Sequence, residues 1–230
     1  MRSRPGWPSS GVSSVLDRLR RTIKQRGVVG TLRLLPARLL AHVVHKEHHV
    51  WYELDPAAIS PRELRPGYQL ERGGPENLPL PDQDEREHER YSREMARGNE
   101  LWLVCNDGDV AFYCFLYRHE SPTVAASGGR LRLPEQTVCL ESSTTLAEHR
   151  GKGIAPAAWT LLAARLRDQG VTSLITKVET SNTPSRRACE KAGFREIARM
   201  TYTVTGLRSR VHIDGEPAGM AGELAQRLNR

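Results

Sequence analysis

Two glycines alternate with two basic side chains in the segment Arg150-Gly151-Lys152-Gly153. A glycine lets the backbone approach a ligand closely because it has no side chain. If a helix begins directly after this segment, its unpaired N–H groups add partial positive charge to the full charges of Arg150 and Lys152. This combination of residues suits the binding of a phosphate or pyrophosphate group.

The flanking segments predict a strand before this glycine turn and a helix after it. Residues 137–145 form a β-branched and apolar run, which is typical of a strand. Pro156 suits the first turn of a helix, and Gly170 suits its end. Between them, apolar residues recur on one helix face at Ala158, Leu161, Leu162 and Leu166. The predicted order is therefore strand, glycine turn, helix.

Two common nucleotide-binding motifs do not fit this turn. The dinucleotide fingerprint has a third glycine, where this chain has Pro156, and a carboxylate roughly 20 positions later. Residues 169–172 contain no carboxylate. A Walker phosphate loop ends in Gly-Lys-Ser/Thr, which the sequence lacks. Dinucleotide and nucleotide binding are therefore minor alternatives.

A second motif lies downstream of the turn. Residues 182–194 read Asn-Thr-Pro-Ser-Arg-Arg-Ala-Cys-Glu-Lys-Ala-Gly-Phe and follow a strand-like run over residues 173–178. Together, residues 150–155 and 182–194 resemble the pyrophosphate motif and the Asn…Glu-Lys-x-Gly-Phe segment of the GNAT superfamily of acyl-CoA-dependent N-acetyltransferases. The resemblance covers about residues 68–205 and is best over 137–195.

The resemblance implies a fold, a reaction and a cofactor site. The implied fold is an α/β domain with a mixed, mostly antiparallel central sheet flanked by helices. The implied reaction moves an acetyl group from acetyl-CoA to a primary amine by direct attack in a ternary complex, with no metal. The turn would bind the pyrophosphate, and Asn182 would steady the pantetheine arm in a groove between two splayed strands. The implied cofactor-binding residues are Ser143, Thr144, Thr145, Leu146, Arg150, Gly151, Lys152, Gly153, Ile154, Ala155, Asn182, Ser185, Arg187 and Lys191. Thr183 is expected to cap the following helix. Arg186 is expected within reach of the adenosine 3′-phosphate together with Arg187 and Lys191, and the alternative is that all three are solvent-facing charges of that helix.

Glu141 is the predicted general base. It is the only carboxylate in the run 137–145, and partial burial there is expected to raise its pKa towards a useful value. Many members of the resembled family carry an acidic residue at about this place. The alternative is a carboxylate that is simply hydrogen-bonded at a sheet edge. Glu148 and His149 are ranked lower.

The general acid is left unassigned. Where the resembled family commonly has a tyrosine just before Glu-Lys-x-Gly-Phe, this chain has Cys189. A thiol with a pKa near ~8.5 could protonate a thiolate of similar basicity. The alternatives are inert packing of Cys189, with water as the proton donor, and a phenol supplied by Tyr202 from the next strand.

Length and composition are those of a soluble domain with an extension. The 230 residues are 38% hydrophobic and 27% charged. Residues 1–50 hold ten Lys or Arg and two Asp or Glu, a net +8, and the remaining residues sum to −1. We therefore predict a basic N-terminal extension over 1–50 and a GNAT-like acyltransferase domain over 51–230. The four cysteines show no Cys-x-x-Cys spacing, and no signal sequence or membrane span is recognised, so a cytoplasmic location is expected.

The extension is predicted to contain basic helices. Apolar residues recur at helical spacing over 15–23 and again over 32–44. We favour packing of these helices on the catalytic domain or on a second copy of the chain, a homodimer. Peripheral contact with the inner face of an anionic membrane is the alternative. A helix would place His42, His45 and His49 on one face, where a solvated helix end is expected rather than a metal site.

The rest of the chain shows the pattern of an α/β domain. Residues 101–105 and 110–117 are apolar and flank Asn-Asp-Gly-Asp, a strong hairpin signal. Strands are also predicted over 51–54, 68–72, 196–204 and 210–213, helices over 82–97 and 222–228, and a loop over 121–133.

Two other functions remain open. A GNAT-like aminoacyl transferase would use charged tRNA, but no aromatic and basic surface pattern supports nucleic acid as a partner. A non-catalytic CoA-binding scaffold at the membrane surface is left open by the missing tyrosine, whereas Glu141 and the intact glycine turn oppose it. The sequence does not identify the acceptor amine.

Overall fold

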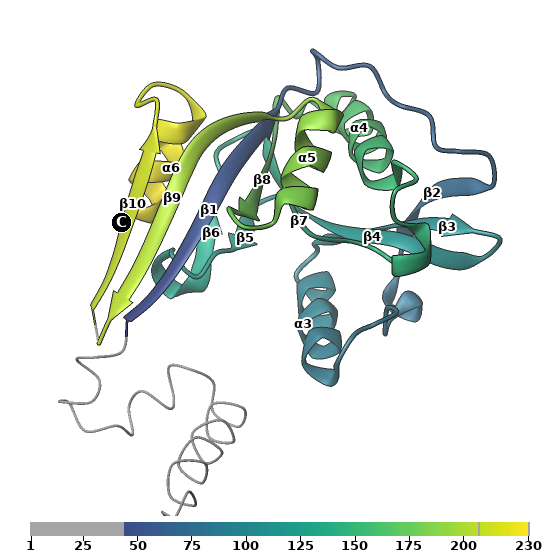
Figure 1. The fold of residues 1–230 in the computed structure, drawn as a ribbon, viewed down its shortest axis with the longest axis horizontal. Coiled ribbons are helices and arrows are strands. Elements are labelled where there is room, and N and C mark those ends of the chain that lie inside the picture. The colour runs from purple at the N-terminus through teal and green to yellow at the C-terminus, as the bar shows by residue number, and fades with distance from the viewer. Residues whose placement is uncertain (1–43, 207, 230) are drawn as a thin grey trace, which may run out of the picture. The chain divides into compact units, whose positions relative to one another are not determined.

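An eight-stranded sheet forms the centre of the fold (Figure 1). The computed structural model describes residues 44–206 and 208–229. The order of strands in the sheet is β10-β9-β1-β8-β7-β4-β3-β2. The strands are β1 (Val44–Leu54), β2 (Tyr68–Gly73), β3 (Glu100–Asn106), β4 (Asp109–Tyr117), β7 (Thr137–Thr145), β8 (Ser173–Glu179), β9 (Arg195–Thr205) and β10 (Arg208–Gly215).

Helices cover both faces of this sheet. Residues of α4 and α5 pack in one hydrophobic cluster, and residues of α3 and α6 pack in the other. A separate small sheet consists of β5 (Glu120–Pro122) and β6 (Arg130–Arg132). The helices are α3 (Glu85–Ala96), α4 (Ile154–Arg167), α5 (Thr183–Ala192) and α6 (Met220–Leu228), with single 3₁₀ turns at Pro75–Asn77, Ser127–Gly129 and Ala147–His149.

The described strand pairs make the sheet mixed. The pairs β1–β8, β2–β3, β3–β4 and β4–β7 are antiparallel, whereas β7 and β8 run parallel. The chain between β7 and β8 contains α4, because parallel neighbours need a crossover connection. The predicted mixed, mostly antiparallel sheet flanked by helices is therefore confirmed.

The second half of β1 is buried on both faces. Tyr52 and Leu54 pack in the cluster of α4 and α5, whereas Trp51 packs in the cluster of α3 and α6. Successive side chains of a strand point to opposite faces, so each face of β1 contributes to one core.

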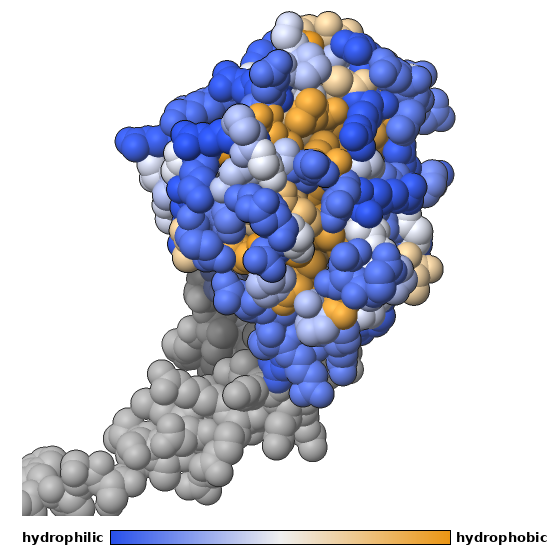
Figure 2. Space-filling view, turned by 90° about the vertical axis from the view of Figure 1, so that its right-hand side faces the viewer, coloured by the Kyte–Doolittle hydropathy of each residue, from blue (hydrophilic) through white to orange (hydrophobic). Residues whose placement is uncertain are grey.

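Figure 2, which faces the side of β2 and β3, shows hydrophobic residues in a central band with hydrophilic residues around it.

The helix predicted to run through the histidines is wrong where the structure describes it. Residues 44–49 belong to β1, and His49 pairs with Glu179 of β8. A short apolar run fits helical and strand periods alike, and here pairing with β8 decides between them. The predicted domain boundary after residue 50 falls inside β1, and His42 lies outside the described residues with the rest of the predicted extension.

The hairpin and the charged helix are confirmed. Asp107 and Gly108 connect β3 to β4 with φ of +53° and +89°, as a two-residue hairpin turn requires. Asp84 caps α3, because its side chain accepts a hydrogen bond from the Glu87 N–H at 2.9 Å. The loop predicted over 121–133 contains part of the short pair of strands β5 and β6.

The chain divides into two compact units. Of the described residues, the larger comprises 47–202 and 211–229, and the smaller contains 44–46, 203–206 and 208–210. All contacts and cavities described below lie within the larger unit.

Candidate active site

β7 and β8 separate part-way along their length. Their parallel pairing covers residues 137–139 of β7 and 173–175 of β8, although both strands continue beyond it. On the other side of β7, Ser142 and Ser143 lie together opposite Cys114 of β4 and form a bulge. Among the described strand pairs, the second half of β7 therefore has no partner on its β8 side, and this is the groove that the resemblance implied.

The glycine turn lies at the N-terminus of α4, as predicted. Gly151 and Gly153 have φ of +74° and +77°, in the left-handed region that favours glycine. Gly153 is the N-cap residue, and no side chain caps the helix. The first N–H groups of α4 are therefore available to an anion.

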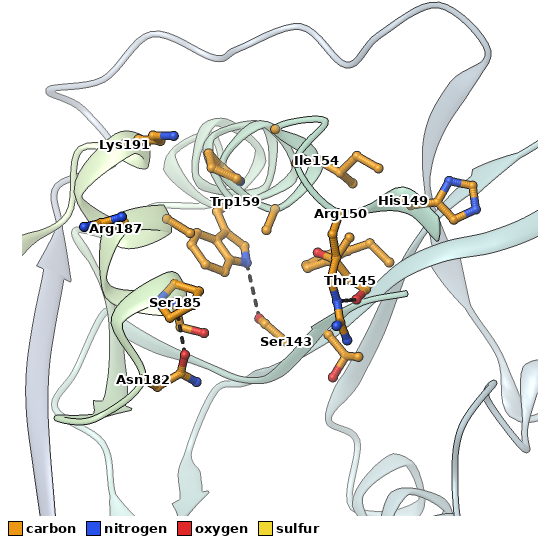
Figure 3. A pocket seen from close by; sticks show the side chains of 18 residues that line it. Ser143, Thr145, His149, Arg150, Ile154, Trp159, Asn182, Ser185, Arg187 and Lys191 are labelled. Carbon is orange, nitrogen blue, oxygen red and sulfur yellow. Dashed lines mark hydrogen bonds between the residues drawn. The ribbon is translucent and has the colours of Figure 1, made fainter. Parts of the chain in front are cut away.

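A cavity of about 670 Å³ is lined by this turn, the free half of β7 and the start of α5 (Figure 3). All but two of the predicted cofactor-binding residues line it, the exceptions being Leu146 and Lys152. The structure thus brings together residues from three separate segments of the sequence. The lining residues that the sequence did not indicate are Phe112, His149, Pro156, Trp159, Pro184 and Ala188.

The two exceptions have other partners. Leu146 is buried, and its N–H donates a hydrogen bond to the Ala111 carbonyl at 3.0 Å, so it is not available to a ligand. Lys152 Nζ donates to the Tyr68 hydroxyl at 3.0 Å and lies 5.7 Å from the centre of that ring. The lysine therefore supports the turn from the outside.

Tyr68 links the edge strand β2 to the glycine turn. Its hydroxyl lies 3.0 Å from His149 Nδ1 as well as 3.0 Å from Lys152 Nζ. The Tyr68 and His149 rings meet edge to face, with centroids 5.7 Å apart. A phenol can accept from an ammonium and donate to a neutral imidazole nitrogen, so both contacts can form together. His149 itself lines the cavity, so Tyr68 holds one residue of the glycine turn and the residue directly before it.

Basic side chains stand on two sides of the cavity (Figure 3). Arg150 Nε donates to the Thr145 carbonyl at 3.1 Å, which holds its guanidinium beside the end of β7. Arg187 and Lys191 are four residues apart on α5 and therefore share a helix face. The cavity thus offers positive charge both at the turn and along α5.

The start of α5 differs from the prediction in its capping residue. Asn182, not Thr183, is the N-cap, because its Oδ1 accepts a hydrogen bond from the Ser185 N–H at 3.2 Å. Arg186 does not line the cavity, since its Nε donates to the Tyr52 hydroxyl at 3.1 Å. Arg186 is therefore held by Tyr52 outside the lining of the cavity, and its place near a 3′-phosphate stays a prediction.

Trp159 closes the inner side of the cavity (Figure 3). Its Nε1 donates to Ser143 Oγ at 3.2 Å, which joins α4 to the bulge in β7. Its ring meets Phe194 edge to face at 5.9 Å. Only the bulge brings Ser143 under α4, so sequence spacing alone does not reveal this contact.

A smaller cavity of about 280 Å³ lies on the opposite face of the sheet, beside the cluster of α3 and α6. Glu141 and Ser142 line it, whereas the next residues, 143–145, line the larger cavity. Consecutive residues of β7 therefore line the two cavities. The smaller one also contains Lys177 of β8 and His49 of β1.

Glu141, the predicted base, forms an ion pair. Lys177 Nζ donates to Glu141 Oε1 at 2.5 Å, and the two side chains are 12% and 16% exposed, respectively. Lys177 Nζ also donates to the Pro122 carbonyl at 2.9 Å and lies 5.6 Å from the Trp51 ring centre. The carboxylate is thus hydrogen-bonded, but within the sheet rather than at its edge.

The two acids considered from the sequence lie away from both cavities. Cys189 is 1% exposed in the cluster of α4 and α5, and burial raises the pKa of its thiol to about 12. Tyr202 packs beside the opposite cluster from β9 and lines neither cavity. The position of Cys189 agrees with inert packing, and the general acid remains unassigned.

Neither a metal centre nor a membrane-spanning helix is found in the described part of the chain. Within residues 44–206 and 208–229, no group of three or more His, Cys, Asp or Glu is placed to hold a metal ion. In the same ranges, no helix is long and apolar enough to cross a membrane.

Several solved structures are similar to this chain. Among solved structures, a Drosophila protein is similar over 86% of this chain and 67% of its own, with a TM-score of 0.53 and 11% identity. A GNAT-family acetyltransferase from Colwellia psychrerythraea is similar over 85% of this chain and 74% of its own, with a TM-score of 0.50 and 16% identity. A tandem GNAT protein from the clavulanic acid biosynthesis pathway is similar over 71% of this chain and 55% of its own, with a TM-score of 0.49 and 18% identity.

A family match covers more than half of the chain, although no curated protein sequence matches the chain. The family described as Acetyltransferase (GNAT) matches residues 66–194, which contain the glycine turn, both cavity-lining halves of β7 and α5. The chain therefore belongs to the acetyltransferase (GNAT) family.

Proposed function

We propose that this protein transfers an acetyl group from acetyl-CoA to a primary amine by direct attack in a ternary complex. The observation that carries the proposal is the larger cavity, which joins an anion-binding helix start to a strand with free backbone groups. An acyl-CoA has a pyrophosphate, which suits the helix start, and a pantetheine arm with amide groups, which suits the free backbone groups of the strand.

The donors around the cavity match the charges of acetyl-CoA. The uncapped N–H groups at the start of α4 and the Arg150 guanidinium would bind the pyrophosphate. Arg187 and Lys191 would bind the 3′-phosphate from α5. A backbone N–H of the free half of β7 would stabilise the negative charge that develops on the thioester oxygen.

The acceptor would reach the thioester from the opposite face of the sheet. Glu141 and Ser142 line the smaller cavity, and Ser143 lines the larger one. A thioester held beside Ser143 is therefore within a residue or two of the groups that line the smaller cavity. Direct attack needs both substrates in contact at once, and cavities lined by consecutive residues of one strand suit that arrangement.

Isothermal titration of acetyl-CoA tests the cofactor. We expect wild type to bind it and the double variant Gly151→Asp/Gly153→Asp to lose binding, because the added carboxylates repel pyrophosphate. Gly170→Asp is the matched control, since Gly170 has φ of +80°, has open space around its Cβ position and lies outside the cavity. This control adds one carboxylate, against two in the double variant, at the same kind of backbone conformation and should bind like wild type.

Failure of folded wild type to bind acetyl-CoA would contradict the proposal. Longer acyl-CoAs and charged tRNA would then be tested, and a ribonuclease-sensitive activity would indicate the tRNA-dependent alternative.

A further inference from the structure

The smaller cavity contains polar atoms without partners. Two buried atoms of its lining, His49 Nδ1 and Thr123 Oγ1, have no hydrogen-bond partner among the described residues. A buried polar atom without a partner costs about 1–3 kcal/mol, so such atoms are uncommon in folded proteins. Two residues that line one cavity thus carry unpartnered polar atoms, as suits a cavity for a polar guest.

Three adjacent strands place His49 beside the Glu141–Lys177 ion pair. In the antiparallel register of β1 and β8, Trp51 pairs with Lys177 and His49 pairs with Glu179. Directly paired residues lie on the same face of a sheet, so His49 and Lys177 both project to the side of α3. Glu141, His49 and Lys177 line the cavity together.

Of these three groups, His49 is the one with a ring nitrogen, Nδ1, that has no hydrogen-bond partner among the described residues. Glu141 Oε1 already accepts from Lys177 at 2.5 Å and from the Cys139 thiol at 3.5 Å. Lys177 is held by Glu141, by the Pro122 carbonyl and by the Trp51 ring. A general base needs a lone pair directed at the incoming proton, and a neutral imidazole supplies one.

The charges around His49 favour its neutral form. Burial lowers the pKa of His49 below its usual value of 6.5, and the Lys177 ammonium lowers it further, whereas the carboxylates of Glu47, Glu141 and Glu179 act in the opposite direction. The imidazole is therefore unprotonated at neutral pH, as a base must be. The charged and titratable groups that face it or share its cavity are Glu47 on β1, Arg90 on α3, Tyr117 on β4, Glu141 on β7, and Lys177 and Glu179 on β8.

We infer that the smaller cavity binds a small primary amine and that His49, rather than Glu141, removes the proton from it. This inference rests on the proposed function, because it assumes a thioester in the larger cavity. A volume of about 280 Å³ lies just below the usual range of ligand pockets, roughly 300–1,000 Å³, and suits a small molecule. The Glu141–Lys177 pair then shapes the cavity and positions His49.

The acceptor ammonium gives one proton to the His49 imidazole, and the nitrogen lone pair forms a C–N bond with the thioester carbon. The C–S bond breaks, and its electron pair leaves on the sulfur of CoA. The second proton of the nitrogen passes through water to this thiolate, and the His49 imidazolium returns its proton to the solvent.

The test measures CoA thiol release from acetyl-CoA with propylamine, ethanolamine and putrescine between pH 5 and 9. We expect wild type to acetylate at least one of these amines, with kcat/KM falling below pH 6.5 as His49 becomes protonated. His49→Gln should lower kcat by about 10²–10⁴-fold and remove this inflection. The matched control is His48→Gln, since His48 is the neighbouring exposed histidine and contacts Thr201 instead. It should keep both the rate and the inflection.

Three other results would contradict the role of His49, the small-amine cavity or the proposed function, respectively. An inflection that persists in His49→Gln but disappears in Glu141→Gln would make Glu141 the base. No acetylation of any of the three amines by a protein that binds acetyl-CoA would overturn the small-amine cavity. Absence of acetyl-CoA binding to wild type would instead contradict the proposed function.

A second measurement applies if His49→Gln does not fold. Wild-type protein with ring-labelled histidine is titrated by nuclear magnetic resonance, with His49 assigned through its backbone. We expect a neutral His49 ring at pH 7. A protonated ring at pH 7 would exclude it as the base.

Discussion

Lys177 Nζ lies 2.5 Å from Glu141 Oε1 and joins β8 to β7 just beyond the point at which their pairing ends. The ion pair thus connects two strands where no backbone hydrogen bonds do. It stands 12–16% exposed, so solvent screens it less than a surface pair. We expect this contact to maintain the spacing between the two cavities.

Breaking this pair should destabilise the protein. Glu141→Gln leaves the Lys177 charge half-satisfied, and Lys177→Gln does the same to Glu141, so each should lower the free energy of unfolding by about 1.5–3 kcal/mol. The double variant Glu141→Gln/Lys177→Gln should lose less free energy of unfolding than the two single variants together, because it leaves no unpaired charge. Urea denaturation of all four proteins measures the coupling. Additive losses would show that the pair contributes no coupling to stability.

Tyr68 should contribute to cofactor affinity without lining the cavity. Tyr68→Phe removes the hydroxyl that holds His149 and Lys152, so the glycine turn loses two contacts. At about 0.5–1.5 kcal/mol for a hydrogen bond, the Kd for acetyl-CoA should rise roughly 2–13-fold, with little change in kcat.

Titration calorimetry against a matched tyrosine checks this expectation. Tyr91→Phe also removes a hydroxyl that accepts from a cation, Arg90, but it lies on α3 and lines neither cavity. Its Kd should equal that of wild type. Equal changes in both variants would assign the effect to general loss of stability.

The sequence predicted the parts of the site whose signals are local. The glycine turn, the hairpin at Asp107-Gly108 and the ends of α5 depend on residue types at fixed short spacings. Even here one detail failed, because Asn182 and Thr183 are both good N-cap residues and adjacent positions compete.

The parts that failed depend on contacts between distant segments. Tyr68 meets His149 only because β2 is placed at the edge of the sheet. His49 meets Lys177 and Glu141 only through the register of β1 with β8, and the same residues fit a helix pattern equally well. No local signal states which strands pair or in what register, so the second cavity could not be predicted.

Arg187 should discriminate acetyl-CoA from a cofactor that lacks the 3′-phosphate. Arg187→Ala should weaken the binding of acetyl-CoA by about 1.5–3 kcal/mol, roughly 10–150-fold in Kd. It should affect the binding of acetyl-dephospho-CoA far less. The control is Arg199→Ala, because Arg199 is exposed on β9 and pairs with Glu196. Equal weakening of both cofactors by Arg187→Ala would mean that Arg187 binds the pyrophosphate or positions α5.

Cys189 should not act as the general acid. Its thiol is buried, lines neither cavity and has a pKa raised to about 12, so Cys189→Ala should leave kcat within about twofold of wild type. It should still cost about 1 kcal/mol of stability, as a core substitution does. Cys114→Ala, which removes an equally buried thiol from the same cluster, is the control. A large loss of kcat in Cys189→Ala alone would restore the thiol as a catalytic group.

His49 should make the stability of the protein depend on pH below 6.5. Its pKa in the folded state lies below the unfolded value of about 6.5, mainly because of burial. The unfolded chain therefore binds more protons than the folded chain in this window. Stability contributed by neutral His49 is present above pH 6.5 and is lost as the pH falls through the folded pKa.

Melting temperatures at pH 7.5 and pH 5.0 measure this effect. We expect the melting temperature of wild type to fall further between pH 7.5 and pH 5.0 than that of His49→Gln. The reason is that the variant has no imidazole to become charged inside the cavity. His48→Gln, which removes an exposed imidazole one residue away, should follow wild type. The other titrating groups are common to all three proteins, so their contributions cancel in the comparison. If the melting temperature fell equally in wild type and His49→Gln, His49 would have the same pKa in the folded chain as in the unfolded chain. The buried surroundings proposed for His49 as the base would then be wrong.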